Sequence, residues 1–191
     1  MQTVTIETLL GGLQEIPAEN FGVGTVCDFL RANPVDFDSL RPYLFFSQTC
    51  YTRNLIFKNE LFEVMTLCWE NGQATPIHDH DGQNCWMAMP HGKLQIVNFR
   101  TAETVAAHNL CRVEQAERFD VAQFCAAEVD PAEPIHQILN LPEFNSRAVS
   151  LHIYSRPFTS CQVYSTSLNE VRTRQLCYHS IGGKICTAAG N

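Results

Sequence analysis

The spacing of hydrophobic residues changes once along this chain, near residue 50, and that change limits the folds that the chain can adopt. Up to that point, apolar residues recur every three or four positions in the segments 6–16 and 23–31, which is the period of an amphipathic helix. Beyond it, the apolar runs are short, rich in β-branched and aromatic residues and bounded by turn clusters; they cover residues 54–57, 61–69, 94–99, 148–154 and 162–164. The pattern predicts a mainly β fold, an antiparallel barrel or sandwich, behind a short helical N-terminal segment.

The length of 191 residues suits one domain with a hydrophobic core of its own. The sequence contains no internal repeat and no low-complexity segment that would mark a second unit. We therefore expect a single domain over 1–191, with a helical cap at 1–50, a β-barrel at 51–180 and a loosening tail at 181–191.

The charge balance narrows the classes of partner. The chain has 13 Lys and Arg against 20 Asp and Glu, a formal net charge of −7. It therefore lacks the positive field with which proteins bind a nucleic-acid backbone or an anionic membrane surface. No apolar run is long enough to cross a bilayer, and the first residues lack the pattern of an export signal. We expect a cytoplasmic monomer that acts on a small molecule and binds neither nucleic acid nor membranes.

The nine cysteines carry little information by their number alone. The count is odd, no two of them form a Cys-x-x-Cys pair, and a chain of this length folds without disulfides. Most of them, Cys161 and Cys177 included, are therefore expected to be reduced thiols, commonly buried as small hydrophobic side chains. A cysteine with a special role must be recognised by its neighbours.

The most informative segment contains two histidines separated by one residue, His78 and His80. Side chains alternate along a strand, so both imidazoles would project from the same face at a strand end and suit two ligands of one metal. A third histidine, His136, follows far downstream in an apolar segment. Taken singly, the pair can also be interpreted as an accidental surface pair, and His136 as a core histidine with hydrogen bonds of its own.

Together the two segments resemble the cupin signature, a pair of motifs that places histidines and a carboxylate around one metal. The matching positions are Gly72, His78, His80, Gly92, His136 and Asn140. Two positions depart from it: Cys85 stands where cupins usually carry the ligating glutamate, and Glu133 stands at a glycine position. With three neutral imidazoles alone, a divalent ion would keep its full charge and open coordination positions. Such a site should favour an anionic, chelating substrate.

A cysteine in place of that glutamate is typical of a narrower family, and the chain resembles the cysteine dioxygenases of the thiol dioxygenase group. Several segments resemble that family in order, over about residues 51 to 179. They are Tyr-Thr-Arg-Asn-Leu at 51–55, Leu-Cys-Trp at 67–69, Ile-His-Asp-His at 77–80 with Cys85, His136 with Asn140, and Ser-Leu-His-Ile-Tyr-Ser at 150–155 with Pro157 and Phe158. The resemblance implies a cupin-type barrel and the oxidation of L-cysteine by O2 to cysteine sulfinate.

The same resemblance implies one ferrous ion, Fe(II), per chain, bound by His78, His80 and His136, with O2 as co-substrate and no organic cofactor. Arg53 and Tyr51 would hold the carboxylate of the substrate. The chemistry of the residues agrees with this assignment, because a guanidinium grips a carboxylate with two parallel hydrogen bonds that lysine cannot make.

Tyr154 would be the active-site phenol. In many members of the family this phenol is joined to a cysteine by a thioether bond, and here that cysteine would be Cys85. Ser150 and His152 would form a relay behind the phenol, with Trp69 packed beside them. Residues two apart share one face of a strand, so the serine, the imidazole and the phenol can line up as a hydrogen-bonded row.

Three alternatives stay open at this point. Arg156 stands where mammalian-type members carry proline; it either points to solvent or supplies a second cation, as in relatives that act on 3-mercaptopropionate. Those relatives generally carry glutamine at the position of Arg53, so cysteine is the expected substrate. The other two alternatives are a non-enzymatic metal-binding cupin, which would not need the row at 150–154, and a zinc hydrolase, for which the sequence offers no clear general base.

Overall fold

The computed structural model describes residues 2–105, 110–129 and 134–186. The chain begins with the helices α1 (Ile6–Gln14), η1 (Ala18–Asn20), α2 (Val23–Ala32) and η2 (Phe37–Tyr43). The strands are β1 (Thr52–Lys58), β2 (Phe62–Trp69), β3 (Ile77–His78), β4 (Cys85–His91), β5 (Lys93–Val105), β6 (Leu110–Ala122), β7 (Ala126–Glu128), β8 (Ile135–Leu139), β9 (Ala148–Ser155), β10 (Ser160–Ser165), β11 (Glu170–Gln175), β12 (Ser180–Ile181) and β13 (Lys184–Ile185). The short 3₁₀ helix η4 (Pro142–Phe144) precedes β9. Glu133 lies outside the described residues.

These elements confirm the predicted fold class, a mainly β chain behind a helical N-terminal segment. The helices predicted over 6–16 and 23–31 are α1 and α2, and Thr5 caps α1 by accepting a hydrogen bond from the amide of Thr8. Every predicted strand overlaps β1, β2, β5, β9 or β10. The division into one domain with a cap and a barrel stays a prediction.

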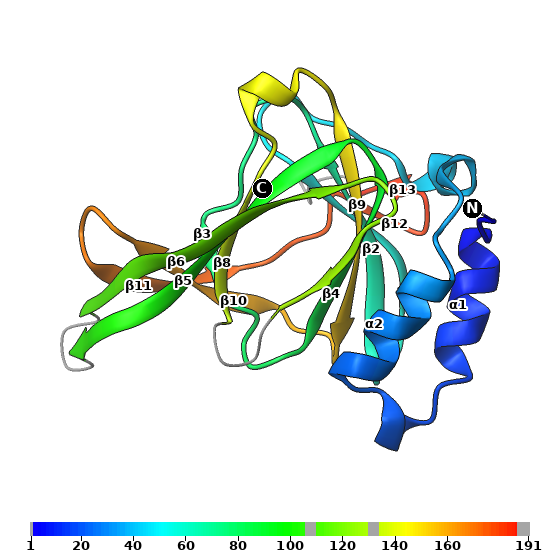
Figure 1. Cartoon of the computed structure of the whole chain (residues 1–191), viewed down its shortest axis with the longest axis horizontal. Helices are drawn as coiled ribbons and strands as arrows, with labels where there is room; N and C mark the ends of the chain where they lie inside the picture. The colour runs from blue at the N-terminus through cyan, green and yellow to red at the C-terminus, as the bar shows by residue number, and fades with distance from the viewer. Residues whose placement is uncertain (1, 106–109, 130–133, 187–191) are drawn as a thin grey trace.

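The strands form a seven-stranded sheet in the order β13-β12-β1-β2-β9-β4-β7 and a closed barrel of β10, β11, β6, β5, β8 and β3. The pairings are antiparallel except for that of β1 with β12. In Figure 1, α1 and α2 lie beside the sheet that contains β2, β4 and β9, on the side away from the long β5–β6 hairpin. The helices therefore cover one face of that sheet.

Alternation along three strands separates the core under the helices from the interior of the barrel. The cluster under the helices includes Ile6, Leu9, Leu13, Val26, Leu30, Phe62, Val64, Trp86, Leu151 and Ile153. The positions between them on β2, β4 and β9 enter a second cluster, with Met65, Leu67, Trp69, Cys85, Met87 and Tyr154. Each buried apolar side chain contributes roughly 1.5–3 kcal/mol. One face of the sheet thus anchors the helical cap, and the other face carries the predicted site residues.

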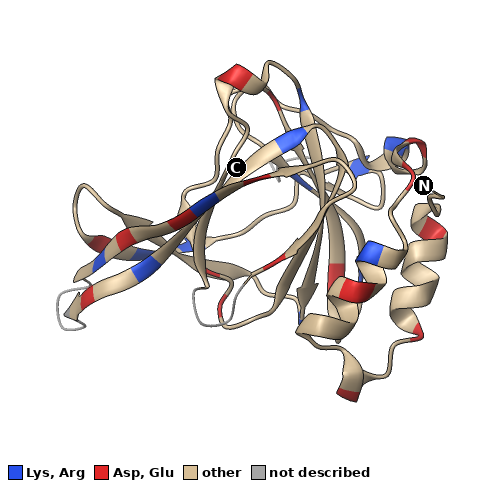
Figure 2. Cartoon of the chain, in the orientation of Figure 1, with Lys and Arg blue, Asp and Glu red and all other residues tan. Residues whose placement is uncertain are grey.

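The surface mixes charges of both signs. Figure 2 shows Lys and Arg interspersed with Asp and Glu along β5 and β6. Lys93 and Asp120, on these two strands, form an exposed ion pair of 2.6 Å. No helix within the described ranges has the length and hydropathy needed to span a bilayer.

The carboxyl end differs from the tail expected at 181–191. Its described part, as far as Cys186, forms a hairpin of β12 and β13, and β12 pairs with β1. Gly182 and Gly183, with φ values of 55° and 78°, make the turn between the two strands in a backbone conformation that glycine adopts without strain. The glycines that suggested a loosening chain therefore form the turn of a hairpin that extends the sheet. Residues 187–191 lie outside the described residues.

The two glycines of the cupin motif differ in how strongly the fold requires them. Gly92, with φ of 79°, joins β4 to β5, and a Cβ there would lie 2.7 Å from the carbonyl oxygen of Arg147. Gly72, with φ of 86°, has no atom of the described residues within 4 Å of such a Cβ. Gly92 thus permits both a left-handed backbone and a close approach to the segment before β9.

Replacing these glycines tests that difference. Gly92→Ala should lower the free energy of unfolding by about 3 kcal/mol, because backbone strain and steric overlap add. Gly72→Ala, the matched control, should cost about 1 kcal/mol from backbone strain alone. Urea unfolding of both variants measures the difference, and equal losses would show that the close approach to Arg147 is not limiting.

Candidate active site

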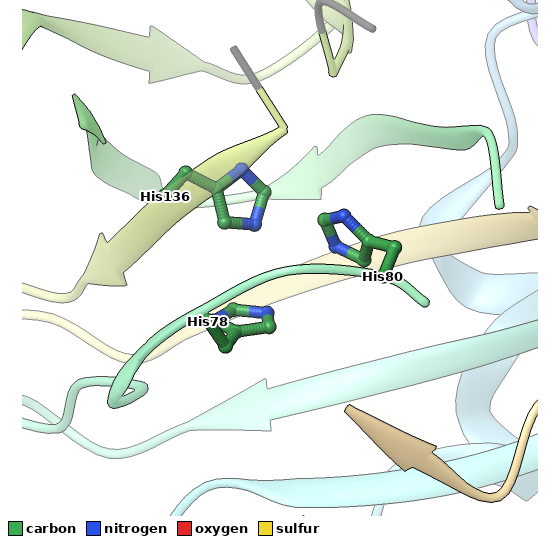
Figure 3. Close-up of side chains that lie close together, drawn as sticks. All are labelled: His78, His80 and His136. Atoms are coloured by element: carbon green, nitrogen blue, oxygen red, sulfur yellow. The ribbon is translucent and has the colours of Figure 1, made fainter. Parts of the chain in front are cut away.

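Three histidines converge at the interior of the barrel. His78 ends β3 and pairs in register with His136 on β8, so the two side chains leave the same face, and His80 follows two residues later. One ring nitrogen from each histidine lies within 4.8 Å of the others. The ring centroids are 4.8 to 5.2 Å apart, and Figure 3 shows the three rings facing a common centre. The predicted metal ligands are therefore brought together by strand pairing.

The hydrogen bonds of these histidines leave nitrogen atoms free for a ligand. His78 Nδ1 lies 3.0 Å from the carbonyl oxygen of Pro76, so it donates its proton there and Nε2 keeps a lone pair. His80 Nδ1 and His136 Nε2 are buried, and neither has a hydrogen-bond partner in the described ranges. Buried polar atoms rarely lack a partner, so these orphaned nitrogens fit a bound cation.

Burial also sets the protonation of the three rings. It lowers the pKa of His78 to about 4. Burial, followed by the other nearby histidines, lowers the pKa of His80 and His136 well below the ordinary value of 6.5. All three imidazoles are therefore neutral at physiological pH, which is the form that binds a metal.

Asp79, between the two motif histidines, fixes their segment to β10. Its Oδ1 accepts a hydrogen bond from the amide of Gln162, and its Oδ2 accepts one from the hydroxyl of Tyr164, both at 3.0 Å. In addition, His78 pairs in register with Val163. The intervening residue of the His-x-His pair thus points to the neighbouring strand and holds the two rings in position.

The row predicted on one strand is present on β9. Trp69 Nε1 donates to Ser150 Oγ at 3.0 Å, Ser150 Oγ lies 2.9 Å from His152 Nε2, and Tyr154 Oη lies 3.2 Å from His152 Nδ1. All four side chains are buried. In the tautomer of His152 that carries its proton on Nδ1, the Ser150 hydroxyl donates to His152 Nε2, and His152 Nδ1–H donates to the phenol oxygen. The phenol O–H is then left to face the pocket.

Burial determines the charge of this row as well. It lowers the pKa of His152 to about 3, with a further contribution from the nearby Arg53 cation, so the ring is neutral. Burial, followed by Cys85, raises the pKa of Tyr154 well above its ordinary value, and the phenol stays protonated. The relay therefore holds a proton at the phenol oxygen.

Cys85 is the direct cross-strand neighbour of Tyr154 in the pairing of β4 with β9. Side chains of such a pair share one face, and Cys85 Sγ also lies 4.0 Å from His152 Nδ1. Burial raises the pKa of this thiol. The structure thus places the cysteine and the phenol of the predicted cross-link side by side.

A pocket that we call the histidine pocket lies beside the three histidines; it is lined by Tyr51, Arg53, His78, His80, Tyr154 and Phe158, with Pro76, Cys161, Arg174 and Leu176. The guanidinium carbon of Arg53 lies 5.7 Å from the centre of the Tyr154 ring. Tyr51 stacks on Trp69 with ring centroids 4.7 Å apart. His136 lines a neighbouring cavity with Cys85 and His152. Every residue predicted for the site therefore lies within one connected group.

The second cation near the pocket is Arg174, and not Arg156, which the sequence analysis considered. Arg156 is exposed, adopts a left-handed backbone with φ of 56°, and donates its amide proton to the carbonyl of Leu61. It lies in the turn after β9 and outside the histidine pocket. Arg174, on β11, is the second guanidinium that lines the pocket.

Sequence reasoning missed two residues beside Arg53. Glu63, on β2, is 0% exposed, and its Oε1 lies 3.8 Å from a terminal nitrogen of Arg53. The hydroxyl of Tyr178 donates to its other oxygen. Glu63 could have been found, because it is a charged residue in phase with Met65, Leu67 and Trp69 on the site face of an apolar strand. Tyr178 lies in a segment without a recognisable pattern.

The family model for cysteine dioxygenase type I matches residues 4–167. Its curated relatives include cysteine dioxygenases type 1 from several vertebrates. The protein from Bos taurus is 29% identical, and the match covers 87% of this chain and 79% of the relative. The protein from Homo sapiens is 31% identical, with 72% of this chain and 67% of the relative covered. The protein from Danio rerio is 27% identical, with 96% of this chain and 90% of the relative covered.

Solved structures with a similar fold include two small β proteins. A protein with a double-stranded β-helix domain from Klebsiella pneumoniae is 11% identical, with a TM-score of 0.48 over 66% of this chain and 95% of that one. An RmlC-like cupin from Desulfovibrio desulfuricans is 15% identical, with a TM-score of 0.42 over 60% and 91%.

The metal assignment predicts that His136→Ala loses metal affinity at least about 100-fold, since the loss of one of three ligands removes a large share of the binding free energy. His91→Ala, at an exposed histidine outside the group, is the matched control and should bind like the parent. Titration with Fe(II) or Co(II) under anaerobic conditions, followed by elemental analysis, measures both. Full metal content in the His136 variant would contradict the assignment.

Proposed function

The chain belongs to the cysteine dioxygenase type I family, and from this membership we propose that it oxidises L-cysteine with O2 to cysteine sulfinate at the site of His78, His80 and His136. The observation that carries the proposal is the group of three buried, neutral imidazoles, with orphaned nitrogens, beside a pocket that contains Arg53 and Tyr154.

Fe(II), one ion per chain, is the proposed cofactor. The donor set supports it, because the metal-ligand group found among the described residues consists of three histidines without a carboxylate. A divalent ion on neutral ligands keeps its charge and open positions, which suits a thiolate substrate. When present, the ion would bind the substrate thiolate and O2. In this proposal O2 is the co-substrate, and no organic cofactor is involved.

Arg53 and Tyr51 are proposed to bind the carboxylate of cysteine. The two residues are two positions apart and so share one face, and both line the histidine pocket. A buried guanidinium makes strong, directional hydrogen bonds to a carboxylate because water competes little there. The anchored carboxylate would orient the thiol toward the three histidines.

Tyr154 is proposed to hold a proton at the reacting centre. The hydrogen bonds from Trp69 through Ser150 and His152 reach the phenol oxygen. With the proton of His152 on Nδ1, the phenol O–H is left to donate into the pocket. His152 acts as a positioning residue in this arrangement, since it is neutral and buried. The phenol can therefore donate a hydrogen bond to an oxygen that reaches the substrate sulfur.

Cys85 is proposed to be joined to Tyr154 by a thioether bond. Formation of the C–S bond removes one hydrogen from the thiol and one from the phenol ring, and O2 is the oxidant that accepts the two electrons. The bond would restrict the phenol and remove a competing thiol from the site. The cross-strand pairing of the two residues supports it.

The alternative with a specific observation in its favour is 3-mercaptopropionate as substrate. Arg174 supplies a second guanidinium to the histidine pocket, and this thiol binds mainly through its carboxylate and its sulfur. The presence of Arg53 favours cysteine. Competing assays on cysteine, 3-mercaptopropionate and cysteamine separate these two substrates. Elemental analysis for iron against zinc tests the alternative of a zinc hydrolase.

The cytoplasmic location and the monomeric state of the protein stay predictions.

The activity itself is directly testable. The Fe(II)-loaded protein should consume one O2 for each cysteine sulfinate formed. Arg53→Ala should raise KM for cysteine by roughly 10- to 100-fold, since a buried, charge-assisted pair of hydrogen bonds is lost. Turnover of cysteamine, which has no carboxylate, should change little. An oxygen electrode with chromatography of the product gives both values, and unchanged kinetics on cysteine would refute the role of Arg53.

The cross-link predicts a change in mass. After turnover, the intact parent protein should lose the mass of two hydrogens, and Cys85→Ser should show no such loss. Cys27→Ser, at a buried cysteine under the helices and outside the histidine pocket, is the matched control and should behave like the parent. Mass spectrometry and gel mobility report the outcome; a loss of two hydrogens in the Cys85 variant would assign the modification elsewhere.

A further inference from the structure

A buried carboxylate lies directly beside the arginine of the histidine pocket. Glu63 is 0% exposed, and its Oε1 lies 3.8 Å from a terminal nitrogen of Arg53. Glu63 is not one of the residues that line the histidine pocket, whereas Arg53 is. The carboxylate therefore contacts the guanidinium without lining the pocket itself.

The position of Arg53 does not depend on Glu63 alone. The guanidinium carbon lies 5.7 Å from the centre of the Tyr154 ring and 5.9 Å from that of Tyr178, and the side chain is 11% exposed. Two aromatic rings and the surrounding protein thus hold the guanidinium in place. The contact with Glu63 is an ion pair without a direct hydrogen bond, since Glu63 Oε1 has no hydrogen-bond partner among the described residues. What Glu63 adds is mainly its charge.

Three neighbouring groups favour the charged form of Glu63, against the larger effect of burial, which leaves its pKa above the ordinary value. Tyr178 donates a hydrogen bond to Oε2, Arg53 lies beside Oε1, and Lys58 is the cross-strand neighbour of Glu63 on β1. Burial raises the pKa of this carboxyl, and these three groups oppose the shift. Tyr154, the neighbour on β9, is a protonated phenol and adds no charge. The pair of Arg53 and Glu63 is therefore close to neutral as a unit.

We propose that Glu63 is a specificity-determining residue whose negative charge offsets that of Arg53, and so limits the advantage that carboxylate-bearing thiols have over thiols without a carboxylate. This inference rests on the proposed function, in which Arg53 binds the carboxylate. A carboxylate bound by Arg53 in the pocket and the Glu63 carboxylate would both lie near one guanidinium, and like charges repel. At about 7 Å and an effective dielectric constant of about 20, this repulsion corresponds to roughly a fiftyfold change in affinity, which screening by solvent and ions reduces to about tenfold.

The test measures selectivity rather than activity alone. The ratio of kcat/KM for cysteine to kcat/KM for cysteamine is determined for the Fe(II)-loaded parent, Glu63→Gln and Glu63→Asp. Glutamine keeps the size and removes the charge, so the ratio should rise roughly tenfold. Aspartate keeps the charge, so its ratio should stay within about threefold of the parent. Glu63→Met, a second charge-free variant of similar length, replaces Glu63→Gln if that protein does not fold.

A binding experiment separates this inference from the proposed function. Calorimetric titration of cysteine and of cysteamine into the metal-loaded protein without O2 gives the same selectivity in the absence of turnover. If the parent forms no sulfinate, the proposed function fails, while the binding ratio still tests Glu63. A ratio that is unchanged or lowered in both charge-free variants, or raised equally in Glu63→Asp, would overturn the inference.

Discussion

Strand register is the constraint on which the rest of this site depends. His78 faces His136, Cys85 faces Tyr154, and Glu63 faces Tyr154 on its other side, each as a direct cross-strand pair. Side chains along a strand have a period of two, so a slip of one residue would turn every one of them to the opposite face. The helical cap opposes such a slip, because the alternate positions of β2, β4 and β9 are buried against α1 and α2. The core beneath the helices and the site on the other face are thus fixed by the same register.

The interior of the barrel holds an unusual number of polar groups, and hydrogen bonds or opposite charges balance most of them. Ser150, His152 and Tyr154 satisfy one another in a single row that begins at Trp69. Such a row is rigid, since moving any member would leave another buried group without its partner. Two of the buried nitrogens without a partner, His80 Nδ1 and His136 Nε2, lie where the metal is proposed. A bound ion would therefore stabilise the fold as well as serve the reaction, because it would satisfy groups that burial has already removed from water.

Much of this arrangement could be predicted from the sequence, because the information is local. The change of hydrophobic period predicted the helices and strands. The spacing of two residues in His78-x-His80 and in Ser150-x-His152-x-Tyr154 predicted side chains on one face of a strand, and the structure has them on one face. The resemblance to a family assigned His136, Arg53 and Cys85 to the same site, although they are far apart in the sequence. The C-terminal hairpin could not be predicted in this way, because two glycines are compatible with a turn or with a loose tail, and only pairing with β1 decides between them.

The charge around Arg53 also could not be predicted from the spacing of residues. It is set by Glu63 on β2, Tyr178 after β11 and Arg174 on β11, which are far apart in the sequence and meet only when the sheet and barrel close. The sequence pointed only to Arg156 as a second cation, and this residue is exposed in the left-handed turn after β9, whereas Arg174 lines the pocket. A motif therefore identifies the groups that contact a substrate, whereas the charges behind them depend on tertiary contacts. Because the energy of a charge pair falls slowly with distance, such residues can influence substrate choice without touching the substrate.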